Sequence, residues 1–232
     1  MRGVILAAGK GTRLGALGAV MPKALLPVGK IPCLEHIILG MKEAGVQRFA
    51  VVIGHLGEMI QSRYGDGSSL GVEITYLQQD LAKYGTGAAV LLAEEFTGGE
   101  PFFVSYGDIA LHPANYPAMA ALYREHQTMV SSANWVADPT LGAAVYLDER
   151  GFLERLVEKP PRGTSATNWN NAGVYILLPQ VFDYLKKLTP SARGEYELTA
   201  AVAQMAAEGV PIMVHRITGF WQDVGNPGTE QI

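Results

Sequence analysis

Short apolar runs alternate with segments of helical spacing through the first half of this 232-residue chain. The runs at 3–7, 49–53 and 101–106 are almost wholly apolar, which predicts strands that are buried on both faces. Between the first two runs, residues 32–44 carry leucine, isoleucine and methionine at helical spacing. This alternation predicts a Rossmann-like α/β fold, in which helices flank a mixed, mostly parallel sheet.

The other predicted elements continue the alternation and become more mixed after residue 130. Strands are predicted over 72–77, 129–136, 143–147, 152–157, 174–178, 212–217 and 220–224. Helices are predicted over 55–64, 86–96, 114–126, 181–188 and 195–208. Thr86 is a candidate N-terminal cap of its own helix. Because no repeat or linker divides the chain, we expect one domain over 1–232, with halves 1–130 and 131–232.

Composition and charge exclude several classes of protein. The apolar fraction is 48% and the charged fraction 17%, which excludes a disordered chain. A net charge of −4 gives no sign of a nucleic-acid partner. The sequence has no apolar run long enough for a signal peptide or a membrane span, and Cys33 has no second cysteine to pair with. We therefore expect a cytoplasmic protein without a membrane partner, and leave open a homo-oligomer.

The first predicted strand runs directly into the glycine-rich segment 8–14, Ala-Gly-Lys-Gly-Thr-Arg-Leu. Small residues let the backbone approach a ligand, and successive N–H groups can cradle phosphate oxygens. Three interpretations compete on these residues alone. The segment lacks the spacing of a P-loop, and a dinucleotide-binding fingerprint would need a third glycine at Leu14. The third interpretation is an ordinary turn from a strand into a helix.

Together with Pro22-Lys23, the segment 6–14 resembles the signature of the sugar-1-phosphate nucleotidylyltransferases. This family includes the thymidylyl-, uridylyl- and guanylyltransferases that make nucleotide sugars. Later segments resemble further motifs of the family and follow one another in the family's order. They are Gly85-Thr86-Gly87 after Gln78 and Gln79, Tyr106-Gly107-Asp108, Glu158-Lys159-Pro160, 171–175 and 221–225. The resemblance therefore covers nearly the whole chain.

The resemblance implies a nucleotide-diphospho-sugar transferase fold and an enzyme that joins a nucleoside triphosphate to a sugar 1-phosphate. A phosphate oxygen of the sugar phosphate attacks the α-phosphorus in line, and pyrophosphate leaves. Because both substrates are anions, catalysis requires cationic side chains and Mg²⁺. The half 1–130 would bind the nucleotide, and the half 131–232 would bind the sugar phosphate.

The resemblance also assigns the residues expected at the reacting phosphates. Arg13 would hold the β- and γ-phosphates, because its planar guanidinium suits phosphate oxygens. Lys23 would lie at the α-phosphate and neutralise charge as the transition state forms. Asp108 and Asp223 would hold Mg²⁺, which prefers carboxylate oxygens. The catalytic set implied by the resemblance is Arg13, Lys23 and Asp108.

The base is expected to lie against the segment that follows Gln78 and Gln79. A glutamine side chain can pair with uracil or thymine through one donor and one acceptor, which favours UTP or dTTP. Gln79 is the candidate and Gln78 the alternative. The full set of nucleotide-binding candidates is Leu6, Ala8, Gly9, Gly11, Thr12, Arg13, Gln79, Gly85 and Thr86.

The sugar phosphate is expected to contact four residues of the second half. Glu158 would accept hydrogen bonds from sugar hydroxyls, and Lys159 would meet the phosphate. Gly142 would let the sugar approach the backbone, and Asn171 would add a hydroxyl contact. Tyr175, which closes the Asn171 motif, is expected in the core.

Some positions differ from the pattern of the family. Gly15, Ala16 and Gly18 stand where many relatives carry arginine, proline and threonine, and Ala200 stands where an acid is common. Guanylyl, adenylyl or cytidylyl transfer to a sugar 1-phosphate or another phosphorylated alcohol is an alternative, as is a non-catalytic sensor of nucleotide sugars. A dinucleotide oxidoreductase would leave Pro22-Lys23 unexplained.

Overall fold

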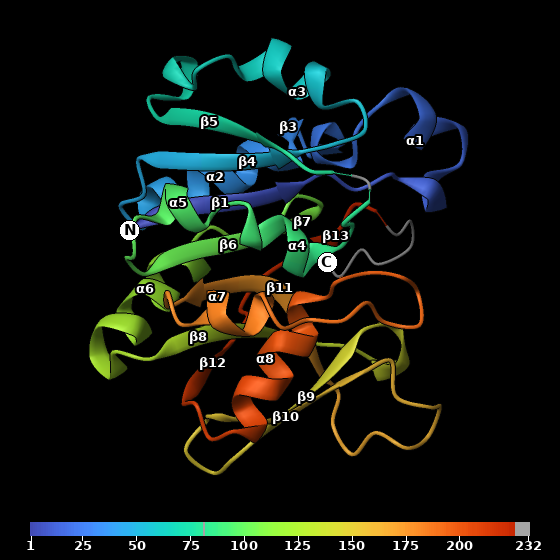
Figure 1. The fold of residues 1–232 in the computed structure, drawn as a ribbon, viewed down its shortest axis with the longest axis vertical. Helices are drawn as coiled ribbons and strands as arrows, with labels where there is room; N and C mark the ends of the chain where they lie inside the picture. Colours follow the sequence, from blue (N-terminus) through green and yellow to red (C-terminus); the bar gives the residue numbers. More distant parts are fainter. Residues whose placement is uncertain (81, 226–232) are drawn as a thin grey trace.

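The computed structural model describes residues 1–80 and 82–225, and its centre is a nine-stranded sheet (Figure 1). The strands of this sheet in chain order are β1 (Arg2–Ala7), β4 (Arg48–Ile53), β5 (Glu73–Gln78), β6 (Phe102–Tyr106), β8 (Met129–Trp135), β9 (Ala143–Leu147), β10 (Leu153–Glu158), β11 (Trp169–Leu177) and β12 (Ile212–Arg216). In space the order is β10-β9-β11-β6-β1-β4-β5, and β8 and β12 continue from β11.

The two halves of the chain build different parts of this sheet. β1 pairs in parallel with β4 and β6, and β4 pairs in parallel with β5. The antiparallel pairs gather in the second half, where β11 pairs with β6, β8 and β9. The predicted Rossmann-like fold, with a mixed, mostly parallel sheet between helices, is confirmed.

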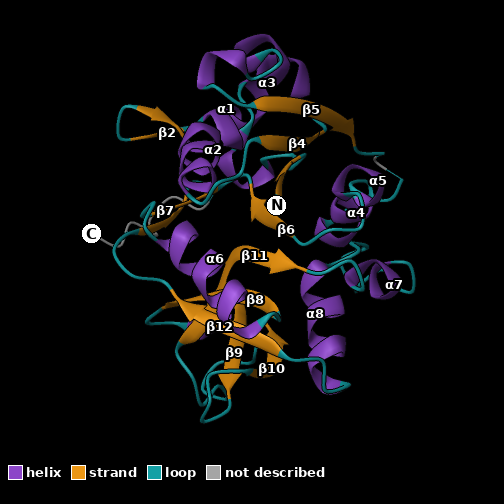
Figure 2. Cartoon of the chain, turned by 90° about the vertical axis from the view of Figure 1, so that its left-hand side faces the viewer, coloured by secondary structure: helices purple, strands orange, loops and turns teal. Residues whose placement is uncertain are grey.

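Helices cover both faces of the sheet, as Figure 2 shows. The helices in chain order are α1 (Ala16–Val20), α2 (Cys33–Glu43), α3 (Gly57–Tyr64), α4 (Thr86–Leu91), α5 (Glu94–Thr97), α6 (Asn115–His126), α7 (Val181–Leu185) and α8 (Leu198–Ala207). Ile5 of β1 packs in the cluster beneath α2 and α6, whereas its neighbour Val4 packs in the cluster beneath α4, α7 and α8. Strands buried on both faces explain the unbroken apolar runs. Within the described residues, no helix has the length and apolar character that a membrane span requires.

Two small ribbons lie beside the main sheet. β2 (Pro27–Val28) pairs with β3 (Ile31–Pro32), and β7 (Ile109–Leu111) pairs with β13 (Trp221–Asp223). The second pair is antiparallel, and its register sets Asp223 opposite Ile109. Because Asp108 directly precedes β7, this pairing brings the two acids side by side.

The predicted helix 86–96 is wrong as a single helix. The chain turns tightly between α4 and α5, where the Ala93 N–H donates to the Val90 carbonyl. Thr86 does not cap α4 either. Its hydroxyl accepts from the Leu198 N–H at 2.9 Å and so caps α8 from a distant part of the chain.

Three other predicted elements differ from the structure by three or more residues at one end. The helix predicted over 181–188 ends at Leu185, the helix predicted over 195–208 begins at Leu198, and the strand predicted over 174–178 begins at Trp169. The register of the longer strand shifts between Asn171 and Tyr175, where Gly173 has a φ of 81°. The strand pairing is irregular at this point, and the polar residues and the glycine there interrupt the apolar pattern that predicts a strand.

Asn115 anchors the segment that leads into β13. Its Nδ2 donates to the carbonyls of His112 and Thr218, and its Oδ1 accepts from the Thr218 N–H and bonds His215 Nε2. The side chain is fully buried at the start of α6. Asn115 therefore connects α6 and β12 to the segment that carries Asp223.

We predict that Asn115→Ala lowers the free energy of unfolding by about 2–4 kcal/mol, since several buried groups lose their partner. Urea denaturation measures the change. Gln127→Ala is the matched control, because that exposed amide bonds only the nearby Arg124 carbonyl. Equal stability of the two variants would contradict a structural role for Asn115.

Candidate active site

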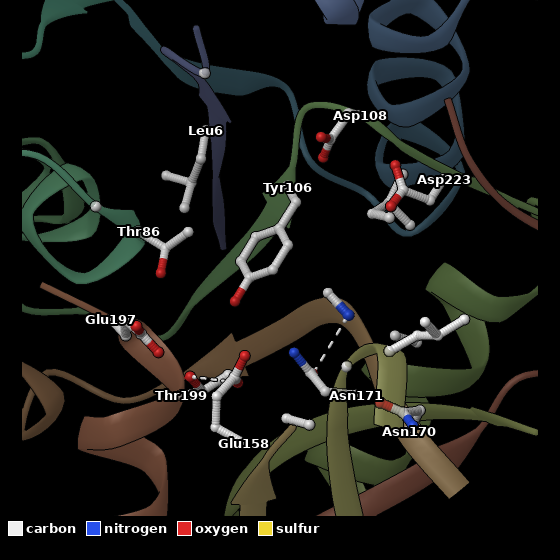
Figure 3. Close-up of a pocket in the computed structure, with 18 of the residues that line it drawn as sticks. Leu6, Thr86, Tyr106, Asp108, Glu158, Asn170, Asn171, Glu197, Thr199 and Asp223 are labelled. Atoms are coloured by element: carbon white, nitrogen blue, oxygen red, sulfur yellow. Dashed lines mark hydrogen bonds between the residues drawn. The ribbon is translucent and has the colours of Figure 1, made fainter. Parts of the chain in front are cut away.

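A cavity of about 370 Å³ opens where β1 and β6 end, and residues of both halves of the chain line it (Figure 3). Ligands of open α/β sheets usually bind at this carboxyl edge. The predicted site residues that line the cavity are Leu6, Ala8, Gly9, Arg13, Lys23, Gln79, Gly85, Thr86, Asp108, Gly142, Glu158, Lys159, Asn171 and Asp223. The structure thus gathers into one space residues that are widely separated in the sequence.

Gly11 and Thr12 are the predicted site residues that do not line the cavity. Gly11 has a φ of 66°, and its backbone lies against Gly18 so closely that a Cβ on Gly18 would overlap the Gly11 carbonyl. Thr12 is exposed at the start of a single 3-10 turn, Thr12–Leu14. Gly18, one of the departures from the family pattern, therefore closes the loop by packing against Gly11.

Asp108 and Asp223 form an acid pair at the upper end of the cavity in Figure 3. The Val224 N–H donates to the Asp108 carbonyl at 2.9 Å, and the Gly225 N–H donates to Asp223 Oδ1 at 2.8 Å. Backbone hydrogen bonds therefore hold both acids in place. Burial, and then the charge of Asp108, raises the pKa of Asp223 to about 6.

Lys23 reaches the acid pair from the segment after the glycine-rich loop. Its Nζ lies 3.0 Å from Asp108 Oδ2, and its side chain is 17% exposed. Gly225 packs against this ion pair, because a Cβ there would meet both Lys23 Nζ and Asp108 Oδ2. Lys23 and Arg13 act against the rise in the pKa of Asp223. Two cations and two acids thus face one end of the cavity.

The acid pair fits a hard divalent cation. Carboxylate oxygens are the ligands that Mg²⁺ prefers, and this ion usually keeps waters and substrate phosphates in its other positions. Over residues 1–80 and 82–225, no group of three or more potential protein ligands gathers. A cation held by both acids would relieve the repulsion between them. Because the protein supplies few ligands, room would remain around the cation for phosphate oxygens.

Gln79 and Gln78 point into different spaces. Gln79 is 5% exposed and lines the cavity, and its Nε2 donates to the Gly85 carbonyl at 2.9 Å. Gln78 lines a separate hollow beside Lys10 and His55. Since the Gln79 amide nitrogen is engaged by Gly85, its oxygen is the group left for a ligand.

Residues 84–87 connect the first half of the chain, at the wall of the cavity, to the second half. The Tyr196 N–H donates to the Tyr84 carbonyl at 2.9 Å, and the Gly87 N–H donates to the Tyr196 carbonyl at 2.7 Å. Gly85 has a φ of 128°, and a Cβ there would overlap the Tyr196 backbone. Glycine is therefore required at position 85 by both conformation and contact.

Glu158 belongs to a charged network at the other end of the cavity. Arg193 Nη2 lies 2.9 Å from Glu197 Oε1 and 3.7 Å from Glu158 Oε1. Burial and the charge of Glu197 raise the pKa of Glu158, and the charge of Arg193 opposes the rise. Thr199 also donates to Glu158, at 3.5 Å. The network sets the orientation of the Glu158 carboxylate.

Lys159 has a φ of 42°, which is uncommon for a residue other than glycine. Its N–H donates to the Gly142 carbonyl at 3.0 Å, and this bond joins two predicted site residues. Backbone strain of this kind concentrates at functional sites. The strained turn places Lys159 at the cavity wall beside Glu158.

Several lining residues were not predicted as site residues, among them Tyr84, Asn134, Asn170, Arg193, Glu197 and Thr199. Arg193 and Glu197 are four positions apart, and the sequence analysis assigns no role to either residue. Asn171 and Tyr175 belong to one motif, so a contact between them could be expected from the sequence. Tyr175 is fully buried, as predicted, and its hydroxyl donates to Asn171 Oδ1 at 2.7 Å.

Comparison with known proteins identifies the family. The family model described as nucleotidyl transferase matches residues 2–229. The chain belongs to this nucleotidyl transferase family. The resemblance to sugar-1-phosphate nucleotidylyltransferases is thereby confirmed.

Individual relatives agree with this assignment to the nucleotidyl transferase family. The chain is 35% identical to the low-salt glycan biosynthesis nucleotidyltransferase Agl11 of Haloferax volcanii, over 98% of this chain and 63% of Agl11. It is 32% identical to the UTP–glucose-1-phosphate uridylyltransferase AglF of the same organism, over 98% of this chain and 92% of AglF. A UDP-glucose pyrophosphorylase solved with UDP-glucose superposes with a TM-score of 0.88 at 25% identity, covering 97% of this chain and 93% of that one. The chain thus spans less than two thirds of Agl11.

We predict that Asp223→Asn stabilises the protein at pH 8. The pKa of this carboxyl rises from about 3.8 unfolded to about 6 folded, so the wild type loses stability as pH rises between these values. The amide cannot ionise, and its oxygen still accepts from Gly225. Its free energy of unfolding should therefore exceed that of the wild type by ~2–3 kcal/mol at pH 8, with little difference near pH 4.

Denaturation at the two pH values measures this difference. Asp66→Asn is the control, since the Ser68 N–H lowers the pKa of the exposed Asp66. Asp66→Asn should show no gain at pH 8. A loss of stability in Asp223→Asn at pH 8 would mean that the charged form of Asp223 is favoured in the folded protein.

Proposed function

We propose that this chain transfers a nucleotidyl group from a nucleoside triphosphate to a sugar 1-phosphate, forming a nucleotide sugar and pyrophosphate. The observation that carries the proposal is the convergence of Arg13, Lys23, Asp108 and Asp223 at one end of a cavity that extends to Glu158 and beyond. Opposed charges of this kind suit a reaction between two anions. The names of AglF and of UDP-glucose pyrophosphorylase refer to this chemistry in those proteins.

The two halves of the chain divide the substrates between them. Residues 1–130 would hold the nucleotide and 131–232 the sugar phosphate, so that the two reacting phosphates meet between the glycine-rich loop and Lys159. Holding both reactants in line replaces an encounter in solution by a positioned reaction. The sugar phosphate oxygen bonds to the α-phosphorus as the bond to pyrophosphate breaks.

Arg13 and Lys23 have separate roles in this reaction. Arg13 lines the cavity beside the glycine-rich loop and is placed to hold the phosphates that leave. Lys23 is held by Asp108 in a partly buried ion pair, so its charge is fixed before the substrates bind. A preorganised cation of this kind stabilises charge that develops at the α-phosphate. Mg²⁺ bound by Asp108 and Asp223 would neutralise phosphate charge.

The sugar side offers hydrogen-bonding groups of both kinds. Glu158 accepts from hydroxyl groups, while Asn171 has its Oδ1 engaged by Tyr175 and Gly173 and so offers its Nδ2 as a donor. Lys159 supplies the positive charge for the phosphate. These groups lie on one wall of the cavity, as Figure 3 shows for Glu158 and Asn171.

The test is a matrix of five nucleoside triphosphates and several sugar 1-phosphates with Mg²⁺, read as pyrophosphate release. We predict that UTP or dTTP gives the highest kcat/KM, because the Gln79 oxygen can accept the N3–H of either base. A clear preference for ATP would exclude this role of Gln79, because adenine has no ring N–H to donate, and a preference for GTP would contradict the predicted choice of a pyrimidine. Binding of a nucleotide sugar without turnover of any pair would indicate a sensor instead of an enzyme.

We predict that Asp108→Asn lowers Mg²⁺-dependent turnover by roughly 100-fold or more, because a hard ligand and the partner of Lys23 are lost together. Circular dichroism should show an intact fold. A calorimetric titration with Mg²⁺ in the presence of UTP should show that this variant binds the ion more weakly than the wild type does. The control Asp66→Asn should match the wild type in both measurements, and a wild-type rate in Asp108→Asn would remove this acid from the site.

We predict that Lys23→Ala lowers kcat by roughly 10²–10³, the usual effect of losing one preorganised stabiliser of the transition state. An interaction that strengthens in the transition state changes kcat, whereas Arg13→Ala should also raise the KM for the triphosphate. Steady-state kinetics separates the two effects. Lys30→Ala, at an exposed lysine outside the cavity, is the control. A change in KM alone would make Lys23 a binding residue.

A further inference from the structure

Two asparagines face each other across the strands that form the far wall of the cavity. Asn134 of β8 lies directly opposite Asn170 of β11 in the antiparallel register, so both side chains stand on one face of the sheet. The residues are 3% and 4% exposed, and both line the cavity. Apolar residues occupy most buried strand positions in this protein, so two opposed amides need a chemical reason.

Three polar atoms of this pair have no hydrogen-bond partner among the described residues: Asn134 Nδ2, Asn134 Oδ1 and Asn170 Oδ1. The fourth atom, Asn170 Nδ2, donates to the Pro139 carbonyl at 2.9 Å. This bond fixes Asn170 Oδ1 as an acceptor. Buried polar groups almost always have a partner, and both asparagines stand at the wall of the cavity, so the three atoms point to a group supplied from outside the chain.

The place of the pair in the cavity indicates which substrate would supply that group. Asn170 lies beside Asn171 on the side of the cavity occupied by Glu158, away from Leu6 and Asp108 (Figure 3). A Cβ on Gly142 would collide with Asn170 Oδ1, so the turn at 139–142 packs directly on this amide. The pair therefore belongs to the end of the cavity assigned above to the sugar, not to the base or the triphosphate.

We propose that Asn134 and Asn170 recognise hydroxyl groups of the sugar 1-phosphate and select sugars that carry two adjacent hydroxyls at the edge facing this wall. The proposal rests on the proposed function. One hydroxyl can accept from Asn134 Nδ2 and donate to Asn170 Oδ1. A hydroxyl on the neighbouring ring carbon can donate to Asn134 Oδ1, which would give all three atoms a partner.

The proposed site discriminates against a sugar that lacks one of these hydroxyl groups. A site built to hydrogen-bond a hydroxyl rejects the analogue that lacks it, because buried polar groups of the protein then stay unpaired. An ordered water held permanently by the asparagines would pair the same atoms without any selection among sugars. A sugar hydroxyl and a permanently bound water therefore predict different substrate profiles.

The experiment compares the best sugar 1-phosphate of the matrix with its series of monodeoxy analogues. With the wild type, we expect one analogue, or two from adjacent carbons, to lose about 100-fold in kcat/KM. Asn134→Val should lose a similar factor on the parent sugar and should scarcely distinguish it from those analogues. Asn134→Ala provides a second variant, in case the branched side chain does not pack.

Ser131→Ala is the matched control. Ser131 lies on the same strand, is fully buried and also has a side-chain oxygen without a partner in the described part of the chain, but it does not line the cavity. This variant should keep the whole deoxy profile of the wild type. Calorimetry with the nucleotide-sugar product and its deoxy forms gives the same comparison without turnover.

The outcomes separate the two proposals. If the wild type turns over the parent sugar and both Asn134 variants keep its deoxy profile, the pair is a structural feature of the wall and this inference is overturned. If the wild type neither turns over nor binds any sugar substrate or product, the proposed function itself fails, and this inference fails with it.

Discussion

Two acids from distant parts of the chain share one end of the cavity because β7 and β13 pair in antiparallel register. The pairing sets Asp223 opposite Ile109, and backbone hydrogen bonds from Val224 and Gly225 fix the adjacent chain. The backbone therefore sets the position of the two acids, which does not depend on their side-chain rotamers alone. The last described strand thus completes a charged cluster whose other members, Arg13, Lys23 and Asp108, come from the first half of the chain.

This arrangement brings like charges together in a partly buried place, which costs stability. The raised pKa of Asp223 expresses that cost, and the ion pair between Lys23 and Asp108 offsets part of it. Asn115 holds Thr218, in the segment that leads into β13, through hydrogen bonds that do not involve the acids. Local instability of this kind is common where charges must meet a ligand.

The sequence predicts those parts of the structure that depend on local pattern. Apolar runs identified the buried strands because burial on both faces leaves few polar positions, and the segment 6–14 with Pro22-Lys23 indicated residues that line the cavity. The break after α4 and the cap that Thr86 gives to Leu198 were missed, since both depend on contacts distant in sequence. Position 134 looks like an ordinary strand residue, and only the register with β11 shows that it faces a second asparagine.

The two ends of the cavity are built by different means. The end proposed for the nucleotide depends on a close approach of backbones, with glycine required at position 85, whereas the end proposed for the sugar depends on side chains that the second half of the chain supplies. The hydrogen bonds of Tyr196 to residues 84 and 87 join these ends, and Thr86 caps the helix that follows Glu197. A displacement of residues 84–87 would therefore also displace Glu197 and, through Arg193, the charged network around Glu158. The two ends of the cavity are therefore coupled by the same contacts that make glycine obligatory at position 85.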